Sequence, residues 1–146
     1  MVVLGLKMLN LMDWRECREK FIKRVEVDQE RIKSIVRIAL LRLERARNIK
    51  VKSVSLIVED YYEVIKELLT AYLLKNGLRS RNHQCLITYF YRENFDYERE
   101  AHIISQMSFF RNRLDYYGEE IPEEFYKKNK EDFEKIIKIL INLIKK

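Results

Sequence analysis

One short segment carries most of the residue types that could bind a phosphate or a base. Arg111, Asn112, Arg113, Tyr116 and Tyr117 lie close together in it. Guanidinium groups pair with phosphates, and tyrosine rings can stack on bases or donate a hydrogen bond to a phosphate. We therefore treat these five residues as a candidate nucleotide- or RNA-binding site.

A simpler interpretation of Arg111 is an ion pair on a helix surface. Asp115 follows Arg111 by four residues, a spacing that places both side chains on one face of a helix. An arginine free to bind an anion and an arginine neutralised by Asp115 are different predictions, and the sequence leaves both open.

The two histidines are not predicted to complete this site. His102 precedes Arg111 by nine residues, which at 100° per residue places it on the opposite side of a continuous helix. His83 is expected at a helix start, where a structural role is favoured. Because neither histidine has local partners, no zinc site is predicted, and the three glycines form no phosphate-binding loop. No metal, flavin or nicotinamide cofactor is expected.

Cys17 and Cys85 show no metal-ligand spacing, so the sequence predicts two reduced thiols in a cytoplasmic protein. The apolar residues 1–12 are interrupted by Lys7 and followed by no small-residue cleavage site. They are therefore predicted to be neither a signal peptide nor a membrane span.

Composition and length predict the elements that position these residues. The chain has 146 residues with only three glycines and one proline, which disfavours β-sandwiches and barrels and favours long helices in one domain over residues 1–146. Apolar residues at helical spacing, with cap residues between them, predict an all-α, up-and-down bundle of four long helices with one or two short extra helices. The expected helices are a short one over 15–23, one after Asp28, 54–75 capped by Ser53, a shorter one beginning at Ser80 or Asn82, 97–118, and 122–144.

The helix after Asp28 is expected to face the core with one apolar stripe. Its members are Ile32, Ile35, Val36, Ala39, Leu40, Leu43 and Ala46.

The basic charge is concentrated in the first third of the chain. Residues 1–52 hold 14 Lys or Arg and 7 Asp or Glu, a net charge of +7, whereas residues 53–146 hold 15 and 16, a net charge of −1. A basic segment of this kind suits an acidic partner such as RNA, and an ordinary solvated helix face explains it equally well.

Two segments resemble the HEPN (higher eukaryotes and prokaryotes nucleotide-binding) domain family. They are Ala71-Tyr-Leu-Leu-Lys-Asn-Gly-Leu-Arg-Ser-Arg-Asn-His-Gln-Cys-Leu-Ile87 and Phe110-Arg-Asn-Arg-Leu-Asp-Tyr-Tyr-Gly118. The second segment lies where the family carries its Arg-x(4–6)-His motif. The resemblance extends over residues 14–145.

The resemblance implies RNA chemistry, but the motif histidine is absent. In active HEPN ribonucleases the arginine and histidine meet across a dimer and promote attack of the RNA 2′-hydroxyl on the adjacent phosphate. Here the positions that would hold the histidine are Tyr116, Tyr117 and Gly118. An unperturbed tyrosine has a pKa near 10 and is a poor base at neutral pH. The resemblance therefore implies a homodimer that binds a nucleotide or RNA in a cleft around Arg111 to Tyr117, with no efficient catalysis.

Two alternatives remain open. The first is a metal-independent endoribonuclease, the toxin partner of a minimal nucleotidyltransferase antitoxin, with Arg111 and Tyr116 as the catalytic residues. In some such toxins the partner modifies a tyrosine after the motif, which here would be Tyr116 or Tyr117. The second is a non-enzymatic assembly module in which Arg111 and Asp115 only stabilise a helix.

Overall fold

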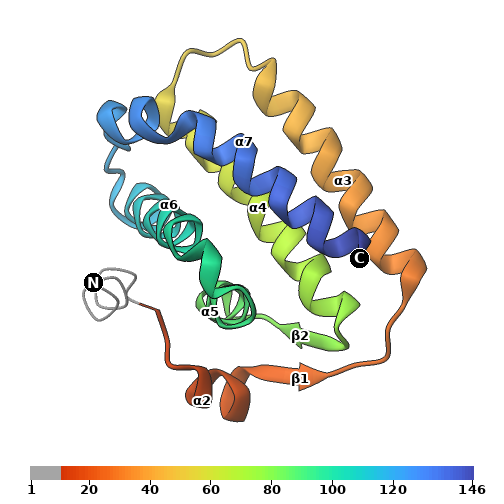
Figure 1. Ribbon diagram of the computed structural model, residues 1–146. Coiled ribbons are helices and arrows are strands. Elements are labelled where there is room, and N and C mark those ends of the chain that lie inside the picture. Colours follow the sequence, from red (N-terminus) through yellow and green to blue (C-terminus); the bar gives the residue numbers. More distant parts are fainter. Residues whose placement is uncertain (1–10) are drawn as a thin grey trace.

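The computed structural model describes residues 11–146, and over these residues the all-α bundle is confirmed (Figure 1). Two short strands pair with each other at one end. In chain order the elements are α2 (Trp14–Glu16), the π-helical turn η1 (Cys17–Phe21), β1 (Ile22–Arg24), α3 (Gln29–Arg47), α4 (Val54–Lys75), β2 (Leu78–Ser80), α5 (His83–Glu93), the 3-10 turn η2 (Phe95–Tyr97), α6 (Glu98–Tyr117) and α7 (Glu123–Lys145).

Helix α4 is the centre of the bundle. It packs against α3, α5, α6 and α7, and Figure 1 shows α3 and α6 on opposite sides of it with α7 across its front. Most of its side chains are buried, as expected of a central helix. The exceptions lie mainly along one stripe, which is half-buried or exposed: Leu56, Glu59, Asp60, Glu63, Lys66, Glu67 and Thr70. We call these residues the open stripe of α4.

The predicted helix boundaries are confirmed where a cap residue marks them. The side chains of Asp28, Ser53 and Asn82 accept hydrogen bonds from the backbone N–H groups of Arg31, Leu56 and Cys85, at 3.1, 3.3 and 3.2 Å. Gly118 ends α6 in the left-handed conformation, with φ at 66°.

The prediction of one helix over 15–23 is wrong. Regular α-helix lasts only through Glu16, and the chain passes through η1 into β1. Strand β1 pairs antiparallel with β2, so that Ile22 lies opposite Ser80, Lys23 opposite Arg79, and Arg24 opposite Leu78. This ribbon joins the N-terminal segment to the connection between α4 and α5.

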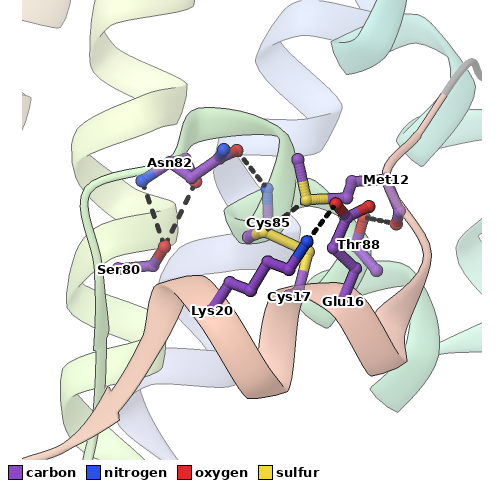
Figure 2. Close-up of a disulfide and its surroundings, with 8 residues drawn as sticks. All are labelled: Met12, Glu16, Cys17, Lys20, Ser80, Asn82, Cys85 and Thr88. Carbon is purple, nitrogen blue, oxygen red and sulfur yellow. Dashed lines mark hydrogen bonds and ion pairs between the residues drawn. A yellow bond between two sulfur atoms is a disulfide. The ribbon is translucent and has the colours of Figure 1, made fainter.

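The prediction of two reduced thiols is also wrong. Cys17 and Cys85 form a disulfide, with their Cα atoms 5.5 Å apart, and both are completely buried. Figure 2 shows the bond joining η1 to the first turn of α5. Beside it, the Thr88 hydroxyl donates a hydrogen bond to the Met12 carbonyl at 2.8 Å.

The apolar stripe of α3 is narrower than predicted. Ile32, Ala39, Leu43 and Ala46 are buried, whereas Leu40 is 42% exposed. Helix α3 lies at the edge of the bundle and packs chiefly on α4, so only a narrow strip of its surface is covered.

Within residues 11–146 no helix is long and apolar enough to cross a membrane.

Candidate functional site

Arg111 is an ion-pair partner in the structure. Its terminal nitrogen Nη2 donates to Glu63 Oε1 of α4 at 3.2 Å, and its Nε lies 3.1 Å from Asp115 Oδ2 without hydrogen-bond geometry. The side chain is only 24% exposed, and its guanidinium lies 5.9 Å from the ring centre of Tyr62. Two carboxylates neutralise this cation, so an external anion would have to displace them.

A carboxyl cluster surrounds this arginine on the open stripe of α4. Glu63 also pairs with Lys66 at 2.7 Å. Burial raises the pKa of Glu59, and a hydrogen bond shared with the Asp115 carboxyl raises it further, while the charge of Arg111 acts in the opposite direction. Three carboxyl groups thus face two cations, and an elevated pKa at Glu59 lets a proton offset the excess negative charge. We call Glu59, Glu63, Lys66, Arg111 and Asp115 the α4–α6 charge cluster.

His83 lies within the electrostatic reach of this cluster. Burial lowers its pKa, and the charges of Lys66 and Arg111 lower it further. The imidazole is therefore neutral at physiological pH.

His102 and Asn112 lie elsewhere on α6. They line a cavity of about 480 Å³ between α5 and α6, together with Gln84, Ile87 and Ser105. Burial lowers the pKa of His102, and its Nδ1 atom has no hydrogen-bond partner within the described residues.

The C-terminal end of α6 presents an exposed group of aromatic side chains around one arginine. Arg113 lies 5.8 Å from the ring centre of Phe109 and 4.9 Å from that of Tyr117, and it pairs with Glu119. Phe109, Tyr116 and Tyr117 are 53%, 78% and 69% exposed. We call Phe109, Arg113, Tyr116 and Tyr117 the α6 aromatic surface.

A single chain does not bring the five predicted site residues into one pocket. Arg111 belongs to the charge cluster and Asn112 to the α5–α6 cavity. Arg113 lies over the ring of Tyr117, at an exposed helix end where Tyr116 also lies. The helical repeat explains this division, because consecutive residues project 100° apart.

Sequence reasoning missed two parts of this region. The first is Glu63, the partner of Arg111 from another helix, which spacing along one helix cannot reveal. The second is a basic pocket at the β1–β2 ribbon, described below, whose walls come from segments more than 50 residues apart.

Over residues 11–146, no group of three or more His, Cys, Asp or Glu side chains is arranged to hold a metal ion. Comparison with known proteins gives no relative, because no family model, no curated protein and no solved structure matches the chain significantly.

Proposed function

We propose that this chain is a HEPN-like protein that binds RNA or a nucleotide without efficient catalysis, and that the α6 aromatic surface makes the contact. The observation that carries the proposal is the exposure of Tyr116 and Tyr117 beside Arg113. Large aromatic side chains are usually covered in folded proteins, and an uncovered cluster of them is typical of binding surfaces.

The chemistry of this surface suits a single-stranded nucleic acid. Bases of any sequence stack on aromatic rings, and a guanidinium held between rings can stack as well as pair with a phosphate. Arg113 is also paired with Glu119, but this ion pair is exposed. A phosphate can therefore replace the Glu119 carboxylate at little cost in free energy.

Arg111 has a structural role in this proposal. Its charge is neutralised by Glu63 and Asp115, which weakens the case for transition-state stabilisation at this residue. The exposed aromatic surface and the half-buried ion pairs of Arg111 together favour binding over cleavage.

The proposal is tested by RNA binding to a double variant of the exposed tyrosines. We expect Tyr116→Ala combined with Tyr117→Ala to weaken binding of a short, fluorescently labelled single-stranded RNA by about tenfold or more at low salt, because stacking contributes roughly 1–3 kcal/mol per base. Fluorescence anisotropy measures the change. Phe95→Ala is the matched control, since Phe95 is 67% exposed but lies on η2. Unchanged binding in the double variant, or no binding by the wild type, contradicts the proposal.

Ribonuclease activity remains a second candidate because His83 lies near Arg111 and Lys66 with a lowered pKa. A neutral imidazole can accept a proton from a ribose hydroxyl. This candidate predicts metal-independent RNA cleavage that His83→Ala abolishes and His102→Ala retains. Intact RNA after prolonged incubation with the wild type eliminates it, and with it the toxin role beside a nucleotidyltransferase partner.

We also propose that the chain forms a homodimer through the open stripe of α4, so that the α6 aromatic surface stays open to RNA in a cleft between the two copies. Leu56 on this stripe is 41% exposed, and Glu63, Lys66 and Arg111 are already paired within the chain, which lowers the cost of covering these three charges. Light scattering should give twice the chain mass of 17.9 kDa. A monomer at micromolar concentration would contradict the homodimer and the binding cleft between its two copies. That result would favour the non-enzymatic assembly module instead.

We also propose a cytoplasmic location. Two reduced cysteines were the reason to expect it, and the Cys17–Cys85 disulfide removes that reason. Disulfides persist inside cells chiefly in hyperthermophiles. Cell fractionation with immunodetection of the chain tests the location, and recovery outside the cytoplasmic fraction would contradict it.

A further inference from the structure

A basic pocket lies at the end of the bundle that carries the β1–β2 ribbon. It has a volume of about 240 Å³, and its walls come from η1 and β1 on one side and from β2 and the start of α5 on the other. All charged residues that line it are cations: its lining consists of Lys20, Phe21, Lys23, Arg79, Ser80, Arg81 and Asn82.

Two of these cations face each other across the ribbon. Lys23 lies directly opposite Arg79 in the antiparallel register, so their side chains project from the same face. Like charges placed directly opposite destabilise a strand pair. The folded chain therefore carries a repulsion at this position that a bound anion would remove.

The lining cations differ from several arginines elsewhere in the bundle. Arg42, Arg47 and Arg99 each pair with a carboxylate of another helix. Within residues 11–146, the only ion pair of a lining residue joins Lys20 to Glu16, at 3.4 Å between two exposed side chains. Lys23, Arg79 and Arg81 thus keep their charge available to a ligand.

The pocket also adjoins the start of an eleven-residue helix. Asn82 is the N-cap of α5, and its backbone N–H donates to the Ser80 hydroxyl at 3.1 Å. The N-terminal end of a helix carries partial positive charge, which adds to that of the side chains.

The two walls are held together covalently. The Cys17–Cys85 bond joins η1 to α5, and Figure 2 shows Lys20, Ser80 and Asn82 around it. A pocket made from two distant segments keeps its shape only while they stay together, and here the disulfide and the ribbon both hold them.

We propose that this pocket binds the phosphate groups of a phosphorylated ligand. Its four cations match a diphosphate in charge and hydrogen-bonding capacity. Its volume is below that of pockets that enclose a whole drug-sized molecule, so it holds the phosphates while the rest of the ligand extends past the rim. The ligand is either a free nucleoside di- or triphosphate or the phosphorylated end of an RNA.

The test is calorimetric titration of the intact, oxidised protein with pyrophosphate at low salt. We expect Lys23→Gln combined with Arg79→Gln to weaken binding by about tenfold or more, because each change removes a charge-assisted hydrogen bond. Lys128→Gln combined with Lys130→Gln is the matched control: it removes the same charge from exposed positions on α7 and should change binding less than about twofold. Thermal unfolding checks the fold, and the pocket variant should melt no lower than the wild type because a repulsion is removed.

Absence of pyrophosphate binding by the wild type, or equal weakening in both variants, overturns the proposal. A second arm compares RNAs with a 5′-phosphate and with a 5′-hydroxyl. Preference for the phosphorylated RNA that the pocket variant loses identifies RNA ends as the ligand, and pyrophosphate binding without this preference identifies free phosphates. The test is independent of the α6 aromatic surface, because pyrophosphate has no base to stack and the tyrosine double variant should bind it normally.

Discussion

Replacing both cysteines, Cys17→Ser with Cys85→Ser, is expected to lower the free energy of unfolding by about 4 kcal/mol. The bond joins residues separated by 68 positions, and closing so long a loop removes much conformational freedom from the unfolded chain. Domains of this size typically have a free energy of unfolding of roughly 5–15 kcal/mol, so the loss is a large fraction of the total. Denaturant unfolding of oxidised wild type and double variant measures it.

The loss should be concentrated where the N-terminal segment meets the bundle. Within α2, η1 and β1 only Cys17 is buried, and the three residue pairs of the ribbon are a further attachment. Hydrogen exchange in the variant should therefore accelerate at Ile22–Arg24 and Leu78–Ser80 before it does so in α4. Wild type under dithiothreitol is the control and should reproduce the variant. An unfolding curve unaffected by both the substitution and the reductant contradicts the prediction.

The sequence predicted the long helices because their signals are local. Apolar residues at helical spacing mark α4 and α7, and the cap residues Asp28, Ser53 and Gly118 mark the start of α3, the start of α4 and the end of α6. The cap residues act through hydrogen bonds between residues at most five apart, so the rest of the fold hardly alters them.

The disulfide and the ribbon escaped prediction because they depend on distant partners. A three-residue strand such as Ile22–Arg24 has no periodicity of its own, and its partner lies more than 50 residues away. The two cysteines are likewise uninformative until the fold brings their Cα atoms to 5.5 Å. The basic pocket depends on both features, which explains why net charge pointed to the first third of the chain without locating a site.

The candidate site shows the same division between local and distant signals. The spacing of Arg111 and Asp115 made their ion pair one of the two interpretations that the sequence left open, and the structure contains this pair at 3.1 Å. It could not predict Glu63, which α4 supplies, or the separation of Asn112 from its neighbours. Charge balance around Arg111 is therefore a property of the packed α4–α6 pair.

The second large effect is expected from Arg111→Gln, which should lower the free energy of unfolding by about 2 kcal/mol at pH 7. This value lies between those of exposed and fully buried ion pairs, as suits a side chain that is 24% exposed. The substitution leaves Glu59, Glu63 and Asp115 facing Lys66 alone. Arg113→Gln is the matched control, because Arg113 pairs with Glu119 at the surface and its loss should change stability little.

The pH dependence of this effect follows from Glu59. Its pKa in the folded protein is raised, so the folded state binds a proton more readily than the unfolded state, and protonation favours folding. Arg111 opposes that shift, and its removal raises the pKa of Glu59 further. The loss of unfolding free energy caused by Arg111→Gln should therefore be largest at neutral pH. It should shrink as the pH falls toward the ordinary pKa of a glutamate.

A second substitution tests this explanation. Adding Glu59→Gln to Arg111→Gln should recover part of the lost unfolding free energy at pH 7, because it removes one of the uncompensated carboxylates. The measurement compares unfolding curves of the wild type, Arg111→Gln and the double variant at pH 7 and pH 5. A loss of unfolding free energy that is equal at both pH values, or that Glu59→Gln increases, would show that Arg111 does not balance the charge of this cluster.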